Sequence, residues 1–218
     1  MKVGTDAVLL GAWAFQNFTH SDGMGLDVGS GCGVITLMMA QRFPQMQWSG
    51  VELNVHAVRE SRENINQSPF SKNIRIHQGD FLAQSFDHAM DLIICNPPYY
   101  QDALESKVEY RNMARQERFL MPELFLEKAY QVGGAHSHLA VVLPLDRKEH
   151  WKKLALPIGW NLSRECAVKG NSHAQANRFL LEWTKSIEAE LESSELILEE
   201  ARGERTKDYQ RLTAEFYL

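Results

Sequence analysis

The chain has 218 residues, of which 44% are hydrophobic and 23% charged, and these proportions exclude the disordered and fibrous classes of protein. The formal net charge of -5 argues against a broad basic surface of the kind that coats nucleic acids. A chain of this length buries roughly 70% of its unfolded surface, so we expect one domain spanning residues 1–218.

Cysteine usage and hydropathy indicate a cytoplasmic protein. The three cysteines, Cys32, Cys95 and Cys166, lie far apart and contain no Cys-x-x-Cys pair. This spacing supports neither a disulfide framework nor a zinc site and fits a reducing compartment. The longest apolar run, residues 7–15, is about half of the ~18 residues that a membrane-spanning helix needs. We therefore expect no membrane association and no bound metal.

Short β-rich runs alternate with longer amphipathic runs, which is the pattern of a mostly parallel sheet flanked by helices. The first expected strands cover residues 24–28, 47–53, 74–77, 90–95 and 138–144. The expected helices cover residues 34–43, 55–66, 122–132 and 146–154. Two further strands, residues 161–168 and 178–183, are joined by a polar turn and close the sheet as an antiparallel hairpin. The pattern predicts an α/β, Rossmann-like fold with a seven-stranded, mostly parallel sheet.

A glycine-rich turn follows the first expected strand and opens the first expected helix. Its sequence is Asp27-Val28-Gly29-Ser30-Gly31-Cys32-Gly33. Glycines let the backbone approach a ligand closely, and such turns bind nucleotide-type cofactors at the carboxyl edge of doubly wound sheets. The spacing Gly-x-Gly-x-Gly differs from the Gly-x-Gly-x-x-Gly of dinucleotide sites, which disfavours a nicotinamide cofactor. Taken alone, the turn is equally explained as a tight connection without a ligand.

Carboxylates follow the next two expected strands. Glu52 ends the second strand, where it can accept hydrogen bonds from both ribose hydroxyls of an adenosine group. Asp80 comes just after the third strand, where it can accept a hydrogen bond from an adenine amino group. Each acid alone is more often a loop residue or a helix cap than a ligand-binding residue. Their succession at strand ends favours an adenosine-containing cofactor.

The segment Asn96-Pro97-Pro98-Tyr99 follows the fourth expected strand and is the most specific signal in the chain. The amino nitrogen of an adenine or an amide is a poor nucleophile because its lone pair is delocalised. The side-chain oxygen of Asn96 and the carbonyl oxygen of Pro97 can accept its two N–H bonds and aim its lone pair at an electrophile. The prolines fix the backbone, and Tyr99 offers a face for stacking.

Together these motifs resemble the class I S-adenosylmethionine-dependent methyltransferases that methylate amino groups. Further segments extend the resemblance to the bacterial tRNA(Val) adenine N6-methyltransferase family from one end of the chain to the other. They are Lys2-Val3-Gly4-Thr5-Asp6, Leu9-Leu10-Gly11-Ala12-Trp13, Glu63-Asn64-Ile65-Asn66-Gln67-Ser68-Pro69, Asn96-Pro97-Pro98-Tyr99-Tyr100 and Leu212-Thr213-Ala214-Glu215-Phe216-Tyr217-Leu218. Members of that family usually carry a further segment before the Lys-Val-Gly-Thr-Asp stretch.

The resemblance implies S-adenosylmethionine as methyl donor and the N6 amine of adenosine-37 in a valine tRNA as acceptor. The implied catalytic residues are Asn96, Pro97 and Tyr99. The implied cofactor-binding residues are Thr5, Asp6, Asp27, Gly29, Gly31, Gly33, Glu52, Asp80 and Asn96. The expected tRNA-binding residues are Pro98, Tyr99, Tyr100, Lys107, Arg111 and Arg115. We expect a monomer with tRNA as its partner.

Three groups of cations are candidates for contacts with tRNA phosphates. They are Lys107 with Arg111, Arg115 and Arg118; Arg202 with Arg205, Lys207 and Arg211; and Arg147 with Lys148, Lys152 and Lys153. Glutamates are interleaved in the first group, so a self-paired solvated helix is an equal alternative there. We expect the third group to be a plain exposed helix face. The net negative charge is concentrated in residues 187–200, which we expect to be an exposed face or a loop after the last strand.

Two other functions are compatible with parts of this pattern. A glutamine N5-methyltransferase acting on a protein uses the same pair of hydrogen bonds to an amide nitrogen. A module that holds a cofactor and RNA without catalysis would need neither Asn96 nor Tyr99. His136 and His138 share strand spacing, but no third residue at metal-ligand spacing accompanies them.

Overall fold

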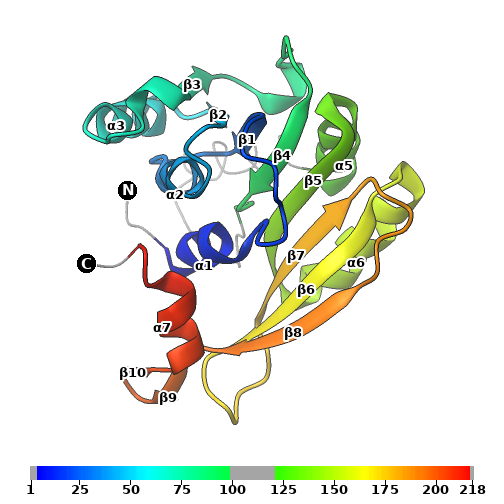
Figure 1. Cartoon of the computed structure of the whole chain (residues 1–218). Helices are drawn as coiled ribbons and strands as arrows, with labels where there is room; N and C mark the ends of the chain where they lie inside the picture. The colour runs from blue at the N-terminus through cyan, green and yellow to red at the C-terminus, as the bar shows by residue number, and fades with distance from the viewer. Residues whose placement is uncertain (1–3, 99–120, 217–218) are drawn as a thin grey trace, which may run out of the picture.

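The computed structural model describes residues 4–98 and 121–216 (Figure 1). The helices are α1 Thr5–Trp13, α2 Val34–Arg42, α3 Val55–Asn66, α5 Pro122–Val132, α6 Leu145–Ile158 and α7 Lys207–Thr213. The strands of the main sheet are β1 Met24–Val28, β2 Gln47–Glu52, β3 Ile74–Gln78, β4 Met90–Cys95, β5 Gly133–Pro144, β6 Asn161–Lys169, β7 Arg178–Thr184 and β8 Glu192–Ile197. The short strands β9 Glu199–Ala201 and β10 Glu204–Arg205 pair separately.

The main sheet has the strand order β3-β2-β1-β4-β5-β7-β6-β8. Neighbouring strands from β3 to β5 are parallel, whereas β7 is antiparallel to both β5 and β6. This arrangement confirms the predicted α/β class and the antiparallel hairpin near the C-terminus.

The predicted strand count of seven is wrong, because the main sheet has eight strands in the described part of the chain. The additional strand, β8, lies within the acidic segment and pairs in parallel with β6. Cations of β6 neutralise its glutamates: Lys169 Nζ lies 2.6 Å from an oxygen of Glu195, and Arg164 Nε lies 3.5 Å from one of Glu192. Leu196 is the buried residue of this edge strand. A glutamate-rich run with one buried apolar residue carries little signal for a strand.

The parallel strands end at one edge of the sheet, which we call the carboxyl edge; the opposite edge is the amino edge. The glycine turn after β1, Glu52 at the end of β2, Asp80 after β3 and Asn96 after β4 all lie at the carboxyl edge. Since β7 runs in the opposite direction, its first residue also lies there: Arg178 pairs with Pro144, the last residue of β5.

Helices cover both faces of the sheet (Figure 1). On one face, α1 and α2 pack against the sheet in a core that includes Leu10, Met39 and Trp48. On the other face, α5 and α6 contribute Phe125 and Trp151 to a second core. Helix α1 is not among the helices that the sequence pattern predicts. Residues Ala7–Trp13 of this helix are all buried, so it lacks the polar face that reveals a surface helix in a sequence.

Candidate cofactor site and active site

The glycine turn forms a tight left-handed backbone path between β1 and α2. Gly29, Gly31 and Gly33 have φ angles of 72°, 54° and 84°, which side-chain-bearing residues rarely adopt. The amides of Gly29 and Ser30 donate to the carbonyl oxygen of Val51, at 2.8 Å and 3.2 Å. Gly29 is exposed, and a Cβ built on it would meet no described atom within 4 Å. The turn is therefore fixed to β2, with open space beside Gly29.

Asp27 is completely buried at the base of this turn. Its Oδ2 accepts a hydrogen bond of 2.6 Å from the hydroxyl of Thr36 in α2. Its Oδ1 has no hydrogen-bond partner among the described residues, and neither does the buried hydroxyl of Ser30. Burial raises the pKa of Asp27 to about 7, although the bond from Thr36 opposes this rise. A buried acceptor without a partner can accept a hydrogen bond from a bound ligand.

Glu52 connects the glycine turn to the start of α3. Its Oε2 accepts from the amide of Gly31 at 2.9 Å, and its Oε1 accepts from the amide of Asn54 at 2.8 Å. An ionised carboxylate has about four acceptor positions, so both oxygens keep capacity for hydroxyl donors. These bonds hold the carboxylate in one orientation beside the turn.

Asp80 caps the short 3-10 helix Phe81–Ala83 through a 2.9 Å bond from the amide of Leu82 to its Oδ1. The helix-cap explanation considered for this residue is therefore correct. It does not exclude the predicted contact with adenine, because a carboxylate that accepts one amide retains further acceptor positions. Its contact with a cofactor stays a prediction.

The end of β4 carries the predicted catalytic segment. Cys95 is the last strand residue and is buried, Asn96 is half-buried, Pro97 is buried and Pro98 is exposed. The strand therefore delivers the Asn96 side chain to the carboxyl edge, next to β1 and its glycine turn. The predicted residues Tyr99, Tyr100, Lys107, Arg111, Arg115 and Arg118 lie outside the described residues.

The two cofactor contacts predicted near the N-terminus, Thr5 and Asp6, have different surroundings. Thr5 is exposed at the start of α1. Asp6 is half-buried, and its Oδ2 accepts a bond of 2.9 Å from Nε of Arg178. The Asp6 carboxylate is thus held by β7 at the carboxyl edge, a partner that the sequence analysis did not identify.

Three further residues support the site, and the sequence pattern predicts a role for none of them: Thr36, Asn54 and Asn64. Asn64 of α3 donates from its side-chain amide to the carbonyl oxygen of Cys32 at 2.9 Å and so braces the glycine turn. Asn54 also caps α3 through its side chain. Asn64 belongs to one of the segments on which the family resemblance rests, but no spacing rule points to its role.

In the second and third groups of candidate tRNA-binding cations, several side chains form ion pairs with acidic residues of this chain. Arg205 is 3.2 Å from Glu199, and Arg211 is 3.6 Å from Asp208. In the third group, Lys148 and Lys152 bind Glu165 at 2.8 Å and 3.1 Å. The expectation of a plain exposed helix face is wrong for these two lysines. The physical reason is the neighbouring strand β6, which presents Glu165 to α6.

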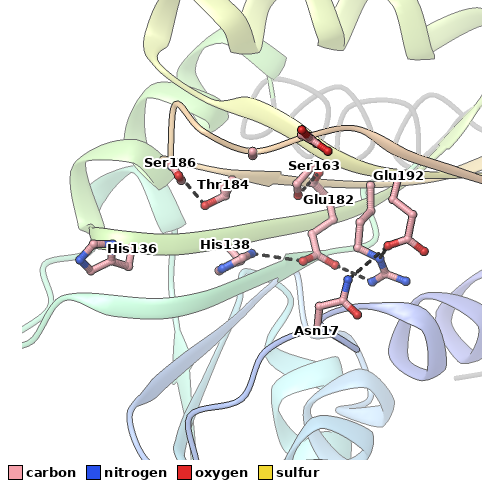
Figure 2. A pocket seen from close by; sticks show the side chains of 11 residues that line it. Asn17, His136, His138, Ser163, Glu182, Thr184, Ser186 and Glu192 are labelled. Carbon is pink, nitrogen blue, oxygen red and sulfur yellow. Dashed lines mark hydrogen bonds and ion pairs between the residues drawn. The ribbon is translucent and has the colours of Figure 1, made fainter.

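His138 lies in a different pocket, at the amino edge, together with His136, Glu182 and Asn17 (Figure 2). Its Nδ1 is 3.2 Å from Oε1 of Glu182. No group of at least three His, Cys, Asp or Glu side chains suited to a metal ion occurs within residues 4–98 and 121–216. In the same residues, no helix combines the length and apolar character needed to cross a bilayer.

The carboxyl edge can hold S-adenosylmethionine. The partnerless Oδ1 of Asp27 suits a cationic donor, and Glu52 suits paired hydroxyls. The open space at Gly29 lets a ligand approach the backbone. The residues present therefore fit this cofactor, and the half-buried Asn96 lies at the same edge.

Comparison with known proteins supports this assignment. Residues 7–123 match the family model described as the methyltransferase small domain. The chain is 34% identical over 218 residues to a tRNA1(Val) (adenine(37)-N6)-methyltransferase from Vibrio campbellii, covering 100% of this chain and 89% of that protein. It is 36% identical over 226 residues to a protein of the same name from Porphyromonas gingivalis, with the same coverage of 100% and 89%.

Among solved structures, the chain is similar to a protein from Agrobacterium tumefaciens described as a predicted O-methyltransferase. The TM-score is 0.74 at 16% identity, and the match covers 96% of this chain and 95% of that chain. Such a low identity shows the fold alone. It confirms the class I methyltransferase fold that the sequence motifs indicate.

Proposed function

The chain belongs to the tRNA1(Val) (adenine(37)-N6)-methyltransferase family, and from this membership we propose that it methylates the N6 amine of adenosine-37 in a valine tRNA. The methyl donor is S-adenosylmethionine, as in class I methyltransferases of this fold. The relatives are named for a reaction on tRNA, which supports our further proposal that this chain works in the cytoplasm.

The observation that carries the proposal is the convergence of three strand ends at the carboxyl edge. The glycine turn follows β1, Glu52 ends β2 and Asn96 follows β4, and β1 pairs with both β2 and β4. The groups proposed to bind the cofactor and the group proposed to position the amine therefore lie on adjacent strands. Transfer between two bound molecules requires this proximity.

In the proposed mechanism, Asn96 and Pro97 position the target amine. The side-chain oxygen of Asn96 and the carbonyl oxygen of Pro97 accept its two N–H bonds, which turns the nitrogen lone pair out of the adenine ring system. The bound cofactor supplies an electrophilic methyl group on a sulfonium. Attack on the methyl carbon would form the N–C bond as the S–C bond breaks, with the neutral thioether as leaving group. The nitrogen would then be cationic and its proton would leave to water, so no strong base is required. Tyr99 is proposed to stack on the extruded base.

The proposed cofactor contacts involve charged groups at fixed positions. Asp27 and the glycine turn would hold the amino-acid part, Glu52 the ribose and Asp80 the adenine. Thr5 stays a candidate for covering the same site. The N–H groups of the turn are braced by Val51 and Glu52 before any ligand binds, which lowers the ordering cost of binding.

Cofactor affinity is expected to increase with pH through pH 7. Burial raises the pKa of Asp27 to about 7, so this carboxyl is largely protonated at pH 6 and ionised at pH 8. An ammonium group on the ligand favours the ionised form, and binding then releases a proton. We predict that S-adenosylhomocysteine binds roughly tenfold more tightly at pH 8 than at pH 6. Calorimetric titration at both values measures this, and a pH-independent affinity would contradict it.

The raised pKa of Asp27 also predicts how the stability of the fold depends on pH. In the folded state the pKa of Asp27 is raised from 3.8 to about 7. The protonated carboxyl therefore contributes stability that is fully present below pH 3.8 and is lost as the pH rises through about 7. Asp27→Asn removes the cost of a buried charge and keeps an acceptor for Thr36. Without cofactor, this variant should be more stable than wild type at pH 8, by up to about 4 kcal/mol. Urea unfolding at pH 5 and pH 8 tests this; an equal effect at both values would refute it.

Incubation of the protein with radiolabelled S-adenosylmethionine, total tRNA and total protein from a strain lacking the enzyme tests the proposed acceptor. We expect label in tRNA, recovered as N6-methyladenosine. Label in protein together with unlabelled tRNA would instead favour the glutamine N5-methyltransferase, which positions an amide nitrogen by the same two hydrogen bonds.

A further inference from the structure

Helix α1 lies beside α2 and runs in the same direction. At the carboxyl edge, Val8 of α1 packs in a cluster with Met38 and Val34 of α2, and Val34 directly follows the last glycine of the turn. At the other end, Nη1 of Arg42 donates to the carbonyl oxygens of Gly11 and Ala14, at 2.8 Å and 2.6 Å. The first turn of α1 is therefore placed near the start of α2, which directly follows the glycine turn.

The amino-edge end of α1 is held by a buried network around Glu182, which is labelled in Figure 2. The amide of Phe15 donates to Oε2 of Glu182 at 2.9 Å, and Arg164 Nη1 lies 3.0 Å from the same oxygen. The guanidinium of Arg164 also lies over the ring of Trp13, 4.3 Å from its centre. Buried charges with several partners hold this end of the helix rigidly.

The carboxyl-edge end of α1 is held differently. Its N-cap residue is Gly4, which has no side chain that could cap the helix. The first turn is joined to the sheet by the Asp6–Arg178 ion pair, whose side chains are 28% and 32% exposed. Arg178 begins β7, next to the end of β5. This ion pair thus connects the part of α1 nearest the cofactor site to a strand that reaches the same edge.

We propose that Arg178 is a positioning residue for cofactor binding: through Asp6, it holds the first turn of α1 against the glycine turn. Arg178 acts through the Asp6 carboxylate and needs no contact with the cofactor. This assignment rests on the proposed function only for the identity of the cofactor. It also gives Asp6 a role other than the direct cofactor contact that the family resemblance implies.

The test is calorimetric titration of the full chain with S-adenosylhomocysteine. We expect Arg178→Ala and Asp6→Asn each to weaken binding about tenfold. Arg178→Lys keeps a cation within reach of Asp6 and should stay within about threefold of wild type. Because both single variants remove the same ion pair, the double variant Asp6→Asn/Arg178→Ala should bind no more weakly than either.

A matched control is Lys169→Ala. Lys169 and Glu195 form an ion pair of comparable exposure, 26% and 44%, at the same edge. Among the described residues, neither side chain forms a hydrogen bond or an ion pair with α1. Removal of this ion pair should lower the melting temperature as much as Arg178→Ala does and leave affinity unchanged. The proposal is overturned if Arg178→Ala binds like wild type, if Lys169→Ala weakens binding equally, or if the losses of the two single variants add.

The titration also separates this proposal from the proposed function. If tRNA is not methylated but S-adenosylhomocysteine binds with the expected pattern across the variants, the acceptor is wrong and the role of Arg178 stands. If wild type binds and the variants follow none of this pattern, the role of Arg178 is wrong and the methyltransferase assignment is untouched.

Discussion

Replacing Asn96 with alanine is expected to slow methyl transfer by about a hundredfold to a thousandfold. The substitution removes an acceptor that orients the amine and localises its lone pair, while β4 and the prolines that follow keep their positions. Affinity for S-adenosylhomocysteine should stay within about twofold of wild type, because Asp27, Glu52 and the glycine turn are unchanged; the same measurement tests the direct cofactor contact that the family resemblance implies for Asn96. Single-turnover rates with saturating cofactor and tRNA measure the first effect, and calorimetry measures the second.

Asn96→Asp is the informative companion variant. A carboxylate oxygen can also accept an amine N–H, so this variant should retain more activity than the alanine variant. If Asn96→Ala lost cofactor affinity as severely as activity, the assignment of Asn96 to the acceptor amine would be wrong. Unfolding curves of both variants show whether the fold is retained.

The second large effect concerns stability. Glu182→Gln is expected to lower the free energy of unfolding by about 3 kcal/mol. Burial favours the neutral form of Glu182, but the bond from His138 and the charge of Arg164 outweigh it and hold the pKa below 4.5. Removal of the carboxylate leaves Arg164, whose side chain is only 7% exposed, without its main counter-charge. Urea unfolding at pH 7 measures the loss.

The exposed pair Arg59–Glu63 provides a control for this experiment. Glu63→Gln makes the same chemical change at the surface of α3 and should cost less than about 1 kcal/mol. The double variant Arg164→Gln/Glu182→Gln should recover part of the loss, because no buried charge is then left unpaired. A loss below about 1 kcal/mol for Glu182→Gln would show that the pair contributes little to the fold.

Most of the sheet could be predicted from the sequence because its central strands are apolar runs with abrupt ends. β1 and β4 begin and end where the sequence analysis placed them. Much of the candidate site followed from the same property, since the glycine turn follows β1, Glu52 ends β2 and Asn96 follows β4. Local pattern is informative wherever a strand is buried on both faces.

The elements that could not be predicted lack a local pattern. Residues 7–13 of helix α1 are apolar and buried on every side, and β8 is an edge strand made mostly of glutamate and serine. Long-range polar contacts are also invisible in one sequence: the residues Asp6 and Arg178 are 172 positions apart. Thr36 and Asn64, which brace the glycine turn, became recognisable only through their distances.

The most direct test of the central claim is methylation of two valine tRNA transcripts, one with adenosine at position 37 and one with guanosine there. We predict that the protein and S-adenosylmethionine convert the first to a product with one N6-methyladenosine, located at position 37 by nuclease digestion and mass spectrometry, and leave the second unmodified. Equal methylation of both transcripts, or none of either by a protein that binds S-adenosylhomocysteine, would contradict the assignment.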